Sequence, residues 1–190
     1  YILGSNFMKA EPVPVDKEGK VFAESTKTIQ TPLWNAYHFF TLYANAGNIT
    51  AYEMTNPTNP LDKYILAELN MLTDIVRDAL NEYKPDVAVK EFVRFLDILN
   101  NWYIRRGRAR FWDEEQDAFD TLYTVLTRFC RVLAPFAPFV SEYIYTNLTG
   151  AESVHLTSFP EMVAADKKIV DDMRRVQMIV SVGKQLREQY

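Results

Sequence analysis

The residues best suited to chemistry are concentrated in residues 101–112, which read Asn-Trp-Tyr-Ile-Arg-Arg-Gly-Arg-Ala-Arg-Phe-Trp. This stretch holds four of the eleven arginines and two of the three tryptophans of the chain. Arginine binds phosphate through paired hydrogen bonds and stacks on bases, and tryptophan offers a flat stacking surface. The composition is therefore suited to contact with RNA. A structural alternative is that the arginines pair with the carboxylates that follow them, which are Asp113, Glu114, Glu115 and Asp117.

The overall composition limits what this stretch can do. The net charge is −4, so a nucleic acid would have to be held by a local patch rather than by the whole surface. A single cysteine, Cys130, excludes an internal disulfide, and with only two histidines it argues against a zinc site. No apolar run is long enough to span a membrane, and no signal peptide is visible. The sequence starts at Tyr1 rather than at Met, which suggests an excised fragment.

Catalytic signatures are missing from the sequence. It contains no glycine-rich phosphate loop, no Gly-x-Ser-x-Gly elbow and no His-Glu-x-x-His motif. Adjacent carboxylates such as Asp171 and Asp172 are typical of solvated helix ends. We therefore expect a binding or structural module with no catalytic residues, no metal and no cofactor of its own.

The first half of the chain is predicted to be helical after an irregular start. Residues 1–22 contain two helix-breaking prolines and a turn signal, as expected of a tail from a preceding domain. From about residue 23 to 46, apolar side chains recur every three or four residues, and Pro32 suits the first helical position. After a loop at 48–60, a second helix begins at Pro60, with Asp62 near its positive N-terminal end, and stops before Pro85.

The third helix leads into the arginine-rich stretch. Asp86 is the predicted N-cap. The apolar stripe continues to Arg106, so either the helix runs past the edge of the bundle or this arginine is buried. A buried arginine needs a carboxylate partner, because an unpaired charge is costly to desolvate. If the helix is contiguous, Gly107 can mark its end. The stripe consists of Ala88, Phe92, Phe95, Leu99 and Trp102.

The second half completes an all-α prediction. A capping box at Asp113 and Gln116 starts a fourth helix, and a fifth, about 138–148, ends at Gly150. Residues 153–156 alternate in polarity and are predicted to be extended. A last helix, roughly 164–188, is expected to pack through Ile169, Met173, Val176, Val180 and Gly183. The sum is an α-helical bundle of five to six helices.

The arginine-rich stretch also resembles a known family. Residues 101–112 are similar to the Asn-Trp-Tyr-Ile-Arg-Arg-Ser-Arg-Arg-Arg-Phe-Trp motif of isoleucyl-tRNA synthetases. Gly107 and Ala109 stand where that motif often has Ser and Arg, so the patch is one charge weaker. Phe159 stands where a tryptophan is common. Further similar segments, at 31–40, 42–45, 61–66, 133–139 with Ser141 and Glu142, and 153–156, follow in the family's order along nearly the whole chain.

The resemblance implies the helical anticodon-binding domain that follows the catalytic domain of a class I aminoacyl-tRNA synthetase. Residues 1–22 would be a remnant of the junction with the catalytic domain, and residues 23–190 would form the helical domain. The implied role is to bind and orient the anticodon stem-loop of isoleucine tRNA. The parent enzyme would ligate isoleucine to tRNA with ATP and magnesium in the cytoplasm, without a membrane or an obligate oligomer. The alternative is a structural module that packs on neighbouring domains and barely contacts RNA.

The candidate contacts with tRNA follow from this interpretation. Phosphates are assigned to the four arginines, and a base can stack on Trp112. Lys184 and Arg187 on the last helix form a weaker second patch. Trp102 is assigned to the core because it lies on the apolar stripe. Arg106 stays open between a buried ion pair and an RNA contact. The four arginines are Arg105, Arg106, Arg108 and Arg110.

Overall fold

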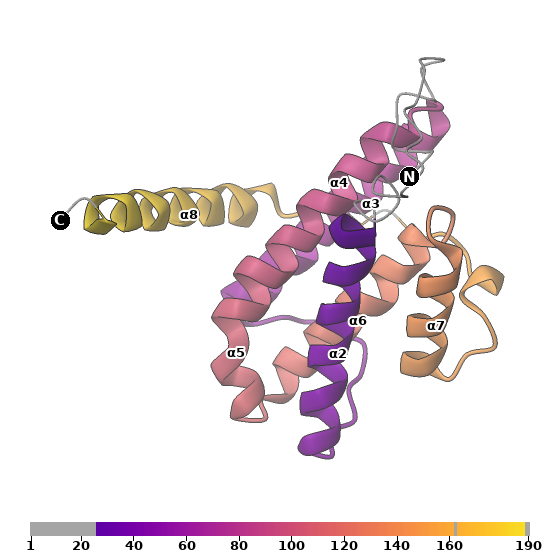
Figure 1. Cartoon of the computed structure of the whole chain (residues 1–190), viewed down its shortest axis with the longest axis horizontal. Helices are drawn as coiled ribbons and strands as arrows, with labels where there is room; N and C mark the ends of the chain where they lie inside the picture. Colours follow the sequence, from indigo (N-terminus) through magenta and orange to yellow (C-terminus); the bar gives the residue numbers. More distant parts are fainter. Residues whose placement is uncertain (1–25, 162, 189–190) are drawn as a thin grey trace, which may run out of the picture.

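The structure, a computed structural model, describes residues 26–161 and 163–188, so the predicted junction at 1–22 lies outside the described residues. The described residues are mostly helical and contain no β-strand (Figure 1), which confirms the all-α prediction. Because α4, η4 and α5 follow one another without a break, these elements form six main helical segments. Their bounds are η3 Thr26–Gln30, α2 Thr31–Ala46, α3 Pro60–Asn81, α4 Pro85–Asp97, η4 Ile98–Ile104, α5 Arg105–Trp112, α6 Gln116–Leu133, α7 Pro138–Thr149, η5 Val154–Leu156 and α8 Lys167–Glu188.

The core lies around α6, whose side chains are buried on almost every turn. This helix packs against α2, α3 and α7, and α3 in turn packs against α4 and α8. Phe129 of α6 contacts Phe92 and Phe95 of α4, with ring centroids 5.7 and 5.3 Å apart. The predicted apolar positions of the fourth helix, such as Leu126, are fully buried. The bundle is therefore held together by a main aromatic and aliphatic core, and a second, smaller cluster of Tyr64, Ala67 and Val170 joins α8 to α3.

Prolines set the helix starts more firmly than carboxylates do. Pro32 lies in the first turn of α2, as predicted, and a π-helical segment, Thr26–Gln30, precedes that helix directly. Pro85 likewise starts α4. The prediction of Asp86 as N-cap is wrong, since Lys84 occupies the cap and Asp86 lies inside the first turn.

The predicted capping box at Asp113 and Gln116 is also wrong. Asp113 ends α5, and Glu114 adopts a left-handed conformation with φ of 55° that reverses the chain before α6 begins. The Gln116 side chain does not reach back to a cap. Its Nε2 instead donates to the carbonyl of Thr50 and to Oδ1 of Asp120, at 2.9 and 2.7 Å. This side chain therefore ties the 48–60 loop to α6.

The segment at 153–156 is a short 3₁₀ turn rather than an extended strand. The Ser153 hydroxyl accepts a hydrogen bond from the N–H of His155 at 3.1 Å. Glu142 of α7 accepts from the Ser153 hydroxyl at 3.0 Å and from the N–H of Val154 at 2.8 Å. These bonds satisfy the backbone locally, so the alternation of polarity does not lead to strand pairing.

A π-helical segment, η4, changes the register of the third helix. The N–H of Arg105 bonds to the carbonyl of Asn100, five residues back. After Leu99 the inward-facing positions are therefore Tyr103, Gly107 and Phe111, all buried. Trp102, expected in the core, is only half-buried, and Arg106 is exposed. Gly107 does not end the helix, which continues to Trp112.

The last helix, α8, begins at Lys167 and extends sideways from the bundle (Figure 1). Its buried residue is Val170, and Ile169, Met173 and Val180 are half-buried. Val176 and Gly183, expected on the packed face, are exposed. The predicted face is thus only partly correct, because the side that meets the bundle carries polar residues beyond the first turns.

Candidate nucleic-acid interface

Arg110 is withdrawn from the surface by an ion-pair cluster. Its guanidinium donates two hydrogen bonds of 2.7 Å to the two carboxylate oxygens of Asp62, which is fully buried in the first turn of α3. The same guanidinium donates to Glu115 at 2.9 and 2.8 Å. The hydroxyl of Tyr103 donates to Asp62 at 2.9 Å. This cluster clamps the end of α5 onto α3, so it orders the arginine-rich helix from the inside.

Electrostatics within the cluster follow from burial and pairing. Burial lowers the pKa of Arg110, but the hydrogen bonds to Asp62 and Glu115 outweigh burial and raise that pKa above its ordinary value. Burial, followed by the charge of Asp62, raises the pKa of Tyr103 well above 10.0. The hydrogen bond from Arg110 lowers the pKa of Glu115. Arg110 and Glu115 are therefore charged at neutral pH, and Tyr103 is a neutral donor.

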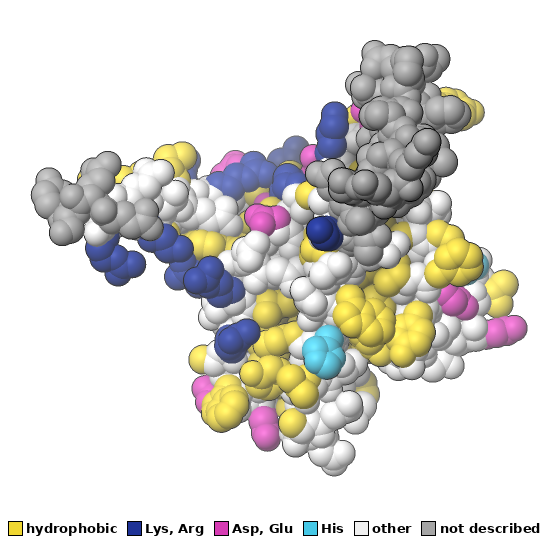
Figure 2. Space-filling model, viewed as in Figure 1, with side chains coloured by type: hydrophobic (Ala, Val, Ile, Leu, Met, Phe, Trp, Pro, Cys, Tyr) yellow, Lys and Arg dark blue, Asp and Glu magenta, His cyan; other side chains and the backbone are white. Residues whose placement is uncertain are grey.

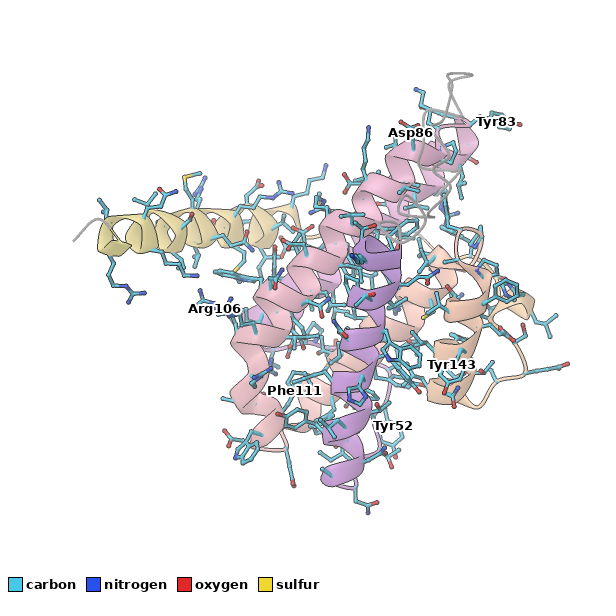
Figure 3. All side chains as sticks on the ribbon, viewed as in Figure 1. Tyr52, Tyr83, Asp86, Arg106, Phe111 and Tyr143 are labelled. Carbon is cyan, nitrogen blue, oxygen red and sulfur yellow. The ribbon has the colours of Figure 1, made fainter. Side chains whose placement is uncertain are left out.

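Arg106 is held on the surface by an aromatic contact. Its guanidinium carbon lies 4.5 Å from the centre of the Trp102 ring, a cation–π arrangement. Figure 3 shows Arg106 in the angle between α8 and α5. Of the two alternatives left open for Arg106, the structure excludes the buried ion pair, since Arg106 is exposed, and it is Arg110, assigned from the sequence to phosphate contact, that is paired with a buried carboxylate.

Arg105, Arg106 and Lys184 meet at one hollow. It has a volume of about 350 Å³ and is lined by these three cations with Asn101 and Trp102. A neighbouring hollow of about 260 Å³ shares Trp102 and Lys184 and extends along α8. Figure 2 shows Lys and Arg side chains along the edge where α8 meets the bundle. The structure thus joins one residue of the predicted second patch to the arginine stretch.

The other candidates lie elsewhere. Arg108 points to the opposite side of α5, with its guanidinium carbon 5.9 Å from the centre of the Phe39 ring. Trp112 is 75% exposed at the end of the same helix. Arg187 is exposed near the end of α8 and lines neither of the two hollows. The candidate residues therefore form two faces, one at the hollow and one at Arg108 and Trp112.

The ion-pair alternative applies to one arginine. Within 26–161 and 163–188, no salt bridge involves Arg105, Arg106, Arg108 or Lys184, whereas Arg110 has two carboxylate partners. Three arginines and one lysine thus keep their charge available for an anionic ligand. Their contact with RNA stays a prediction.

Some residues of the site were not found by sequence reasoning. Asp62 was interpreted only as a helix-start charge, although it is the main partner of Arg110. Asn101 lines both hollows beside Trp102. One signal for the changed register of the helix was available in the sequence. The constant spacing of four between Leu99, Tyr103, Gly107 and Phe111 departs from the α-helical repeat.

Other kinds of site find little support in the described part of the chain. No cluster of three or more His, Cys, Asp or Glu side chains there could hold a metal ion. Cys130 is fully buried, and burial raises the pKa of its thiol. Among the described helices, none is long and apolar enough to cross a bilayer.

Comparison with known proteins identifies the family of the chain. The family model described as "Anticodon-binding domain of tRNA ligase" matches residues 62–190. The chain is 38% identical over 201 residues to isoleucine–tRNA ligase of Protochlamydia amoebophila (strain UWE25), covering 100% of this chain and 19% of that protein. It is 40% identical over 197 residues to isoleucine–tRNA ligase of Leifsonia xyli subsp. xyli (strain CTCB07), covering 100% and 17%. The chain spans less than a fifth of the length of these curated relatives. By its sequence and its helical fold, the chain belongs to the family of anticodon-binding domains of tRNA ligases.

Proposed function

We propose that this chain binds and orients the anticodon stem-loop of isoleucine tRNA, as part of an isoleucyl-tRNA synthetase. The observation that carries the proposal is the convergence of Arg105, Arg106 and Lys184 on one hollow without an ion-pair partner among the described residues. A phosphodiester backbone supplies the anionic oxygens that such a group of cations attracts. The family and the names of the chain's relatives support tRNA as the ligand.

In such an enzyme this domain acts together with a catalytic domain of the same polypeptide. The whole enzyme would ligate isoleucine to tRNA in the cytoplasm, and ATP and magnesium would bind in the catalytic domain. We assign the anticodon-binding domain no catalytic residue and no cofactor, and its function requires no obligate oligomer. Its contribution is to hold the tRNA in one orientation.

The proposal is tested by titrating the chain with an RNA hairpin that has the sequence of the isoleucine anticodon stem-loop, at 50 and 200 mM salt. Alanine at Arg105, Arg106 or Lys184 should weaken binding. The logarithm of the association constant falls linearly with the logarithm of the salt concentration. Each substitution should also make this slope less steep by about 0.7–0.9, the contribution of one phosphate contact. Trp112→Ala should weaken binding with the slope unchanged, because stacking releases no counterion.

Matched controls come from exposed cations away from the hollow. Lys90 on α4 and Arg175 on α8 each have an acidic neighbour within their own helix, Asp86 and Asp172. Lys90→Ala and Arg175→Ala should leave affinity and slope nearly unchanged. If the variants at Arg105, Arg106 and Lys184 behave like these controls, the hollow is not the RNA site. Equal binding of a hairpin from another tRNA would refute the isoleucine assignment.

A second candidate function is structural packing on another domain. Between α2 and α7, Trp34 and Tyr143 are exposed over about half of their surface, with ring centroids 5.5 Å apart. Figure 2 shows hydrophobic side chains gathered on this face. Large exposed apolar patches favour protein contacts. This candidate predicts that Trp34→Ser weakens association with the rest of the synthetase, while Arg105→Ala leaves that association unchanged.

A further inference from the structure

The direction of α8 must be fixed by its first half. This helix extends away from the bundle (Figure 1) and has 22 residues, a length of about 33 Å. Val170 is buried against Tyr64 and Ala67 of α3, whereas residues 181–187 are all exposed. Ile169 and Met173 of α8, both half-buried, pack against the same cluster, but apolar packing is non-directional and leaves the angle and rotation of α8 weakly defined. Polar contacts at Arg174 and Gln177 supply the missing constraint.

These polar contacts reach a buried carboxylate and a buried tyrosine. Gln177 Nε2 donates to the Tyr64 hydroxyl at 3.1 Å. Glu68 is fully buried, and its Oε2 accepts from Arg94 Nη1 at 2.7 Å. Its Oε1 has no hydrogen bond, and Arg174 Nη2 lies 4.0 Å away from it. Arg94 already pairs with Oε2, so the contribution of α8 is to bring the positive charge of Arg174 toward the remaining buried oxygen, Oε1, which favours this position of the helix.

The same face of α8 continues to the cationic hollow. Gln177 and Lys184 are seven residues apart, about two turns, and therefore lie on one side of the helix. Both residues line the hollow of about 260 Å³ beside Trp102, and Lys184 also lines the hollow of about 350 Å³ with Arg105 and Arg106. A change in the angle of α8 would therefore separate Lys184 from the two arginines.

We infer that Tyr64, Glu68, Arg174 and Gln177 are positioning residues, which set the direction of α8 and so hold Lys184 beside Arg105 and Arg106. None of the four needs to contact RNA for this effect. The consequence for RNA binding rests on the proposed function, whereas the effect on α8 does not.

The position of α8 is tested first, without RNA. Gln177→Met removes the hydrogen bond between the two side chains and no charge, and Tyr64→Phe removes it together with the interaction of the Tyr64 hydroxyl with Glu68. Gln185→Met, an identical change at an exposed position of α8, is the control. Spin labels at Met178→Cys and Tyr83→Cys, both exposed sites, report the distance between α8 and the end of α3. The native Cys130 is fully buried and stays unlabelled.

A narrow distance distribution is expected in the labelled parent chain and in the Gln185→Met control. A broader or shifted distribution is expected for Tyr64→Phe and Gln177→Met, with circular dichroism unchanged. Identical narrow distributions in all four proteins would overturn the inference, whether or not the chain binds RNA. If Tyr64→Phe fails to fold, Gln177→Met still decides, because Gln177 is only half-buried on α8.

RNA binding tests the second step, from α8 to Lys184. Gln177→Met should reduce the ratio of dissociation constants between 200 and 50 mM salt by about threefold, as Lys184→Ala does, because both lose one phosphate contact. In a Lys184→Ala background, Gln177→Met should have no further effect. If Gln177→Met weakened RNA binding by the same factor with and without Lys184→Ala, the two effects would be independent, and α8 would not act through Lys184. If neither the parent chain nor any variant binds RNA, the proposed function fails. The distance measurement alone then decides the role of the four residues.

Discussion

Replacing Arg110 with alanine should destabilise the fold rather than selectively weaken RNA binding. Arg110 is the cation that neutralises Asp62, and the two share a pair of 2.7 Å hydrogen bonds. In Arg110→Ala, Asp62 stays fully buried and keeps only the hydrogen bond from Tyr103. Removing one partner of a buried ion pair costs about 3–5 kcal/mol, because the other charge is left uncompensated. We expect a loss of that size in the free energy of unfolding.

Urea unfolding at pH 7, followed by circular dichroism, measures this loss. Asp62→Asn in the Arg110→Ala background removes the stranded charge and keeps an oxygen for Tyr103, so this double variant should be more stable than Arg110→Ala alone. Arg108→Ala, an exposed arginine on the same helix, should change the stability by no more than about 0.5 kcal/mol. A loss below about 1 kcal/mol for Arg110→Ala would refute the reasoning, since it would mean that water reaches Asp62.

Three further predictions concern the helix around this pair and the core. Gly107→Ala should stabilise the chain by up to about 1 kcal/mol in the same assay, because alanine favours the helix and its Cβ would meet only Phe111, at an ordinary 3.6 Å; a loss would indicate hidden crowding. Glu115→Gln should cost less than about 1 kcal/mol at pH 7 because the Glu115 side chain is 44% exposed and solvent screens its charge. The pKa of Glu115 is lowered from 4.5, so its contribution is present above that pH and is lost as pH falls through the lowered value. A cost that persists in acid would contradict this. Leu126→Ala, at a fully buried site, should cost about 2–5 kcal/mol in thermal or urea unfolding, and a negligible loss would contradict its place in the core.

The sequence was sufficient for the fold where apolar periodicity and prolines act together. The second helix, from Pro60 to a stop before Pro85, and the buried face of the fourth helix follow directly from spacing. Prolines at helix starts are dependable because they fix φ and lack an N–H. Side-chain caps were less predictable, since Asp86 and Asp113 had stronger local alternatives in Pro85 and the left-handed turn at Glu114.

The candidate site was predictable in composition but not in arrangement. An α-helical repeat from Leu99 leads to Trp102, Arg106 and Arg110, and the π-helical segment rotates Trp102 and Arg106 outward. The meeting of Lys184 with Arg106 depends on how α8 lies across the bundle, a tertiary contact that no local pattern encodes. The partner of Arg110 is likewise 48 residues away in the chain.

Because of the π-helical segment, the direction in which the arginine side chains point depends on the number of residues between Ile98 and Ile104. Between Ile98 and Ile104 the helix accommodates the equivalent of one surplus residue. A chain shorter by one residue here could form ordinary α-helical turns and still direct Gly107 and Phe111 into the core. An ordinary α-helix of the present length would turn everything beyond by about 100°, which would bring Arg106 toward the core and Gly107 toward solvent. A one-residue deletion in this segment would thus keep the arginines facing outward, whereas loss of the π-helical turn at the present length would change which cations face an RNA without altering any of them.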